Sequence, residues 1–194
     1  MVKRKYDYHP FINDWLKSVE QNKVHSSNEI KQLMNIIRKT LDNPRVFFDA
    51  KQVEKYVELT EKYYFKLMPD QKFYASLILG LYYKDTKQLV FPNVFIMAGR
   101  GWGKNGFIST LADFMLTEHH GVDKYDVDIV ATSEEQAMTS FNEVYDKIEG
   151  LGKEKAKALY DYNLTKITYR KTRSTLKYRT SSAKTKDGGR PGCV

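Results

Sequence analysis

The stretch "MAGRGWGKNG", residues 97–106, contains the residue types with which a protein loop binds phosphate. Glycine recurs at every second position of this stretch, as Gly99, Gly101 and Gly103. Glycines let a backbone wrap closely around an anion and present several N–H groups to it. Arg100 and Lys104 add two cations, and Lys104 stands where a helix is expected to begin. Such a loop could hold the β and γ phosphates of a nucleoside triphosphate.

The stretch departs at both ends from the standard phosphate-loop pattern G-x-x-x-x-G-K-[ST]. Ala98 stands at the first glycine and Asn105 at the serine or threonine that normally binds Mg²⁺. An amide oxygen can replace that hydroxyl as a neutral ligand, although its reach is longer. The alternative is a plain strand-to-helix turn, in which Arg100 is a solvated loop residue and Trp102 simply packs.

The first 85 residues are predicted to form four helices, because their apolar residues recur at spacings of three and four. These helices are expected over 9–21, 27–44, 49–68 and 69–85. Ser27 and Asp49 are positioned as N-caps, and Pro69 occupies a favourable first-turn position.

The pattern changes after this helical segment. Residues 94–97 form a short continuous apolar run, which predicts a strand buried on both faces. A helix over 104–120, a second buried strand over 127–132 and a helix over 133–150 are expected to follow. Ser133 and Gln136, at the start of the last of these helices, have the spacing of a capping box. This order predicts an α/β fold with a partial parallel sheet of the P-loop NTPase type, flanked by helices. We therefore expect a helical segment over 1–85 and a P-loop core over 86–194.

Positive charge is concentrated at the end of the chain. The whole sequence has a net charge of +8, yet residues 1–150 hold 20 Lys and Arg against 21 Asp and Glu, whereas residues 151–194 hold 12 against 3. This last part is predicted to form a short basic helix and a hairpin that turns near 171–173. The candidate nucleic-acid contacts on it are Lys171, Arg173, Lys177 and Arg179. A soluble sheet edge blunted by charge would give the same pattern.

Composition excludes several classes of protein. No apolar stretch approaches the roughly 20 residues that span a bilayer, so we expect a soluble, intracellular protein without a membrane partner. The single cysteine, Cys193, cannot form an internal disulfide, and the four histidines lack a zinc-ligand spacing.

The combination of motifs resembles the N-terminal ATPase domain of the large terminase subunit of tailed bacteriophages. The resemblance rests on "GRGWGKNG", on "ATSEEQAMTSF", and on "SSAKTKDGGRPGCV", which is similar to the run before the acidic Walker B strand. Together these motifs extend over roughly residues 69–194 in the expected order.

The resemblance implies ATP and Mg²⁺ as cofactors and an ATPase that drives DNA into a capsid. It implies catalytic roles for Lys104 and Arg100, with Arg100 near the γ phosphate. It places Gln71 in an adenine-binding segment, although a solvent-facing glutamine in a first helical turn is equally compatible with the sequence. The remaining nucleotide contacts that it implies are Gly99, Gly101, Trp102, Gly103 and Asn105, with Asn105 also as the Mg²⁺ ligand.

The resemblance further implies double-stranded DNA, a portal protein and a small terminase subunit as partners, a homo-oligomer in the assembled motor, and a bacterial host cytoplasm as location. No apolar strand ending in paired acids follows Lys104 in this sequence. We therefore expect a chain that stops before Walker B, lacks the C-terminal nuclease domain, and binds ATP without meaningful turnover.

Two other functions remain open at the level of sequence. One is a helicase-like P-loop ATPase without a packaging role. The other is a non-catalytic DNA-binding or assembly module, in which the basic segment 151–194 acts and the glycine loop is vestigial.

Overall fold

The computed structural model describes residues 8–180 and 191–194 and divides the chain into two compact units. The first unit contains the chain up to Glu58 together with Lys66–Ile96, and the second contains Leu59–Phe65 and the chain from Met97 onward. The units therefore do not follow the expected boundary between residues 85 and 86. Residues 86–96 pack with the helical unit, and the seven residues Leu59–Phe65 pack with the loop-bearing unit.

The first unit consists of helices and a short two-stranded sheet. Its elements are α1 (Pro10–Glu20), α2 (Asn28–Leu41), β1 (Val46–Phe48), most of α3 (Ala50–Tyr63), α4 (Pro69–Gly80) and β2 (Leu81–Tyr83). The predicted caps are confirmed: the Ser27 hydroxyl accepts from the backbone N–H of Ile30 at 3.4 Å, and the Asp49 carboxylate accepts from that of Gln52 at 3.0 Å. Pro69 begins α4, as expected.

The two-stranded antiparallel sheet β1–β2 was not predicted, and it shortens the fourth helix. Residues 81–83 were expected to continue the helix over 69–85, but they pair antiparallel with β1, with Leu81 opposite Phe48. This pairing places Leu81 fully inside the core of the unit, beside Ile12, Ile37 and Phe73. Burial of apolar surface thus outweighs the local helical pattern at this position.

The second unit is a mixed α/β layer. It contains α5 (Lys104–Leu116), β3 (Val127–Ala131), α6 (Glu134–Gly150), α7 (Lys153–Leu159), β4 (Tyr160–Tyr162), β5 (Lys166–Tyr169) and β6 (Ser174–Thr180). The strand order is β3-β6-β5-β4. Among the described strands of this sheet, β3 and β6 pair parallel, whereas β6–β5 and β5–β4 pair antiparallel. The expected parallel sheet is thus a mixed sheet, because the hairpin β5–β6 lies directly beside β3.

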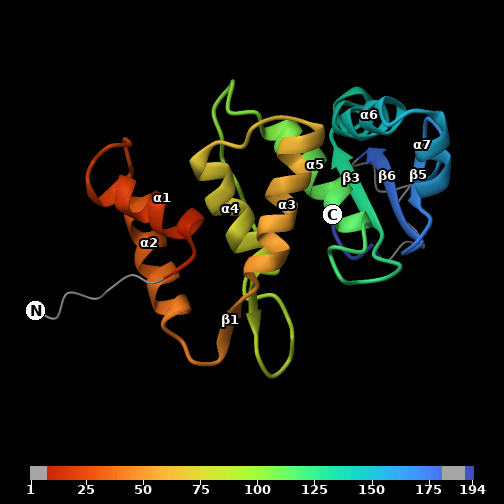
Figure 1. Cartoon of the computed structure of the whole chain (residues 1–194). Coiled ribbons are helices and arrows are strands. Elements are labelled where there is room, and N and C mark those ends of the chain that lie inside the picture. The colour runs from red at the N-terminus through yellow and green to blue at the C-terminus, as the bar shows by residue number, and fades with distance from the viewer. Residues whose placement is uncertain (1–7, 181–190) are drawn as a thin grey trace, which may run out of the picture. The chain divides into compact units, whose positions relative to one another are not determined.

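Helix α6 packs against β3 and β6, and α7 leads directly into β4 (Figure 1). The Ser133 hydroxyl caps α6 by accepting from the N–H of Gln136, which confirms the predicted capping residue. Phe141 of α6 is fully buried, and its ring meets that of Tyr178 on β6 edge to face at 5.1 Å. This contact holds the helix on the sheet.

The expected strand over 94–97 is wrong. These residues form no strand, and the side chains of Phe95 and Met97 are 89% and 87% exposed. A buried strand needs neighbouring strands that pair with its backbone and cover its side chains. No strand of the described residues pairs with this run, so the apolar pattern alone does not bury it.

Residues 192 and 193 lie along the outer edge of β3. Cys193 forms a parallel bridge with Val127, and its carbonyl accepts from the N–H of Asp128 at 3.0 Å. Gly192 lies against the Tyr125 ring, and its carbonyl accepts from the Tyr125 hydroxyl at 2.8 Å. The backbone on this side of β3 is therefore paired where residues 192 and 193 reach it.

We predict that Phe141→Ala lowers the free energy of unfolding by about 3–5 kcal/mol, because it removes a fully buried ring between α6 and the sheet. Urea unfolding followed by circular dichroism measures this change. Asn142→Ala, at the exposed neighbouring position, is the control and should cost less than about 1 kcal/mol. Equal losses in the two variants would contradict the described packing of α6.

Candidate phosphate-binding site

The glycine loop enters α5 through two residues with left-handed backbone. Gly101 has φ of 88° and Gly103 has φ of 81°, and Gly103 is the N-cap residue of α5. Residues with a side chain rarely adopt this conformation, so glycine is required at both positions. The loop is closed by a hydrogen bond from Trp102 N–H to the Gly99 carbonyl at 3.3 Å.

The start of α5 offers unpaired backbone donors. The first bond of the helix runs from Phe107 N–H to the Gly103 carbonyl at 2.9 Å, so the N–H groups of residues 104–106 precede the helical ladder. No acidic side chain stands in the first turn of the helix. No carboxylate of the first turn therefore offsets the positive end of the helix dipole, and the turn favours a bound anion.

The predicted cations of the loop are exposed. Arg100 and Lys104 both lie at the surface, and neither has a carboxylate within ion-pair distance among the described residues. A Cβ atom added at Gly99 or Gly101 would meet no heavy atom within 4 Å. The loop thus has open space beside its backbone and two cations that no internal acid neutralises.

Two further loop residues connect the turn to the protein interior. The Trp102 ring is half-buried and meets Phe107 edge to face at 5.4 Å, the packing role that the sequence left open. The Asn105 carbonyl accepts from the hydroxyl of Ser109 at 2.8 Å and from that of Ser140 at 3.4 Å. Ser140 lies on α6, so the first turn of α5 is held to the neighbouring helix.

Residues 8–180 and 191–194 contain neither a membrane-spanning helix nor a cluster of potential metal ligands. No helix there is both long enough and apolar enough to cross a bilayer. No group of three or more His, Cys, Asp or Glu side chains there could hold a metal ion. Asn105 is exposed, and a Mg²⁺ contact through its side-chain oxygen stays a prediction.

Gln71 lies in the first unit, at the start of α4, and is only 2% exposed. Its side-chain oxygen accepts from the backbone N–H of Met68 at 2.9 Å, as part of a helix cap. It is therefore not the solvent-facing glutamine of the alternative interpretation. An adenine contact by Gln71 stays a prediction.

The four predicted nucleic-acid contacts have different surroundings. Lys171 pairs with Glu118 at 3.1 Å, and Arg179 pairs with Asp128 at 2.6 Å. Arg173 is exposed in the β5–β6 turn with φ of 60°, and Lys177 is half-buried on β6. Two of the four cations thus have internal carboxylate partners, and DNA contact by the set stays a prediction.

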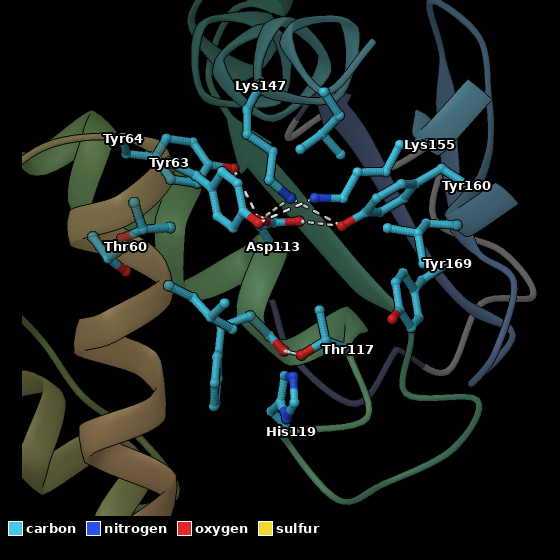
Figure 2. Close-up of a pocket in the computed structure, with 15 residues that line it drawn as sticks. Thr60, Tyr63, Tyr64, Asp113, Thr117, His119, Lys147, Lys155, Tyr160 and Tyr169 are labelled. Carbon is cyan, nitrogen blue, oxygen red and sulfur yellow. Dashed lines mark hydrogen bonds and ion pairs between the residues drawn. The ribbon is translucent and has the colours of Figure 1, made fainter. Parts of the chain in front are cut away.

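A buried ionic network fixes the middle of α5. Asp113 on this helix forms an ion pair with Lys147 of α6 at 2.7 Å, and the side chains are only 10% and 9% exposed. The Tyr64 and Tyr160 hydroxyls donate to the same carboxylate at 3.1 and 3.3 Å, and Lys147 donates to the Tyr160 oxygen at 2.9 Å. Figure 2 shows these groups converging on Asp113.

The network lines a cavity of about 170 Å³ within the second unit. Burial, followed by the Asp113 charge, raises the pKa of Tyr64 and of Tyr160 well above the usual tyrosine value. Both phenols therefore stay protonated and remain donors at neutral pH. At the rim, Lys155 donates to the Tyr63 hydroxyl at 3.4 Å, and its ammonium lies 5.5 Å from the Tyr63 ring centre.

Sequence reasoning did not find this network. Asp113 is a single acid within an otherwise apolar stretch of α5, and this was an available signal of a buried ion pair. Its partners come from three separate segments, represented by Tyr64, Lys147 and Tyr160. No local spacing identifies them.

The structure is similar to the crystal structure of the large terminase of bacteriophage HK97, with a TM-score of 0.59 and 19% sequence identity over 73% of this chain. The match extends over 30% of that protein, so this chain spans less than a third of its length. No protein-family model matches the sequence, and no curated protein matches it in sequence. The chain thus has a terminase-like fold, in agreement with the resemblance of its motifs.

We predict that Asp113→Asn lowers the free energy of unfolding by about 3–5 kcal/mol, because it leaves the Lys147 ammonium buried without a counter-charge. Urea unfolding measures this loss. Asp123→Asn, at an exposed position without an ion pair among the described residues, is the control and should be nearly neutral.

The double variant Asp113→Asn/Lys147→Met tests the cause of that loss. Removal of both charges should recover part of the stability, since no uncompensated ion remains. A single variant as stable as the Asp123→Asn control would contradict the described network.

Proposed function

We propose that this chain binds ATP through the loop Gly99–Asn105 and the first turn of α5. The observation that carries the proposal is the left-handed entry of Gly101 and Gly103 into a helix whose first N–H groups precede the helical hydrogen bonds. Backbone donors and a helix dipole at such a junction favour a phosphate chain. The exposed ammonium of Lys104 supplies charge to the β and γ phosphates.

In this proposal each loop residue has a separate task. The backbone amides orient the phosphates, and the Arg100 guanidinium approaches the γ phosphate, where it stabilises charge during phosphoryl transfer. Asn105 would hold Mg²⁺ through its side-chain oxygen. Bound Mg²⁺ would neutralise charge on the β and γ oxygens.

We propose that the chain acts as part of a phage DNA-packaging terminase. The terminase-like fold and the order of the motifs support this role. In this role, ATP binding serves DNA translocation. The proposed partners are double-stranded DNA, a portal protein and a small terminase subunit. The assembled motor is a homo-oligomer in the cytoplasm of a bacterial host. Turnover needs acidic groups that place metal and water. Among the described residues, no strand after Lys104 ends in a pair of acids. This chain is therefore proposed to bind ATP without appreciable hydrolysis.

Titration calorimetry with ATP and Mg²⁺ tests the binding function. Lys104→Ala should weaken ATP binding at least about tenfold, because the variant loses a charge-assisted contact to phosphate. Lys166→Ala removes an equally exposed lysine from β5 and is the control, with ATP affinity unchanged. Equal affinities of wild type and Lys104→Ala would contradict the proposal.

The proposed DNA contact depends on cations that form no ion pair with a carboxylate of the protein itself. Among the described residues, Arg173 and Lys177 have no ion-pair partner, in contrast to Lys171 and Arg179. Arg173→Gln and Lys177→Gln should each weaken binding of duplex DNA. Each lost phosphate contact should also reduce the magnitude of the slope of log K against log salt concentration by about 0.9. Fluorescence anisotropy at several salt concentrations measures both quantities.

The exposed lysine Lys23, in the first unit, provides the control for the DNA experiment. Lys23→Gln should leave the affinity and its salt dependence unchanged. If all three variants have the same salt slope as the wild type, the hairpin β5–β6 does not contact the DNA backbone.

A further inference from the structure

We propose that a pocket beside the first turn of α5 holds the nucleoside half of the nucleotide, an inference that rests on the ATP-binding function proposed above. The pocket has a volume of about 550 Å³ and lies within the second unit. Phe65 and Gly106 line this pocket, together with Glu143 and Asp146 of α6. We call this space the Phe65 pocket.

The Phe65 pocket begins where the phosphate site ends. Gly106 follows Lys104 by two residues in the first turn of α5, and its N–H is the last of the three that precede the helical ladder. Consecutive residues of a helix rise about 1.5 Å, so the pocket opens about 3 Å along the axis from Lys104. Gly106 also lies about 200° around the helix from Lys104, so a nucleotide with its terminal phosphates at Lys104 would cross the first N–H groups of α5 to reach the pocket.

The glycine at 106 keeps two side chains close to this turn. A Cβ atom at Gly106 would lie 2.8 Å from Cε1 of Phe65 and 3.5 Å from Oε2 of Glu143. Its φ is not in the left-handed region, so backbone conformation does not require a glycine here. Glycine within a helix costs about 0.5–1 kcal/mol relative to alanine. The close approach of the Phe65 ring explains why it is present.

The Phe65 ring and the Glu143 carboxylate have the chemistry to recognise a nucleoside. The ring is half-buried, so part of its surface is open for a base to stack on it. Glu143 is half-buried and has no ion-pair partner among the described residues. A carboxylate beside a phosphate-binding turn accepts hydrogen bonds from ribose hydroxyls, as acidic residues do in dinucleotide sites. We assign the base to Phe65 and the ribose to Glu143.

Gln71 is less suited to read the base. Its side-chain oxygen already accepts from the Met68 N–H, and the residue is almost fully buried. A base could reach its amide only if this cap opened. The Phe65 pocket needs no such rearrangement.

The test compares ATP with inorganic tripolyphosphate, which has the phosphates and lacks the nucleoside. Titration calorimetry gives both affinities for wild type, Phe65→Leu, Phe65→Ala and Glu143→Gln, after circular dichroism has verified folding. Each Phe65 variant should lower the ratio of ATP to tripolyphosphate affinity at least about fivefold, the loss expected for one base stack. Phe65→Leu retains apolar volume and keeps the test usable if Phe65→Ala fails to fold.

Glu143→Gln should lower ATP affinity at least about threefold. It should not change the affinity for 2′,3′-dideoxy-ATP, which has no hydroxyl for the carboxylate to accept from. The matched controls are Glu135→Gln, exposed on the same helix, and Phe47→Ala, a half-buried ring of the first unit. Neither control should alter the ratio.

The outcomes separate this inference from the function on which it rests. If Lys104→Ala weakens both ligands while the Phe65 and Glu143 variants leave the ratio at its wild-type value, the pocket assignment is wrong and the phosphate site stands. If Lys104→Ala leaves both affinities unchanged, the ATP-binding function itself is wrong.

Discussion

The buried carboxylate of Asp113 is the constraint on which the second unit depends. An ion in the protein interior is costly unless charges and hydrogen bonds compensate it, so its partners must keep their positions. Those partners are Lys147 on α6, Tyr160 on β4 and Tyr64 just after α3. Asp113 therefore fixes α5 relative to a helix, a strand and the segment 59–65.

The direction of α5 in turn determines where the loop amides point. Asp113 lies nine residues after Lys104, about two and a half turns along the same helix. At the other end, the Asn105 carbonyl binds the hydroxyl of Ser140, so α6 holds the first turn as well. The loop is thus attached to a helix that is held at two points, and an anion meets donors that are already oriented. Such preorganisation reduces the entropy lost on binding.

Local chemistry allowed much of the fold to be predicted. The caps at Ser27, Asp49 and Ser133 depend on residues three positions apart, and the structure has all three. The β5–β6 hairpin was likewise apparent from alternation and turn residues. The run 94–97 failed because burial of a strand depends on its neighbours, which no local pattern contains.

The candidate site was likewise predicted only in part from the sequence. The glycines and Lys104 are contiguous, so a motif revealed them. The Asp113 network and the Phe65 pocket combine segments that are far apart in the sequence, such as those of Phe65, Gly106 and Glu143, and they were found only in the structure. Gly106 was a visible sign of the pocket, since a glycine inside a helix needs a packing reason, and Asp113 was a visible sign of the network.

The central claim is that the backbone donors between Gly99 and Gly106 hold a triphosphate. Hydrogen–deuterium exchange of the amides, measured with and without saturating ATP, tests it most directly. The account predicts slower exchange of amides 99–106 with ATP and with tripolyphosphate, and no change there with adenosine. Unchanged exchange in this loop, with protection on another segment of the chain, would contradict it.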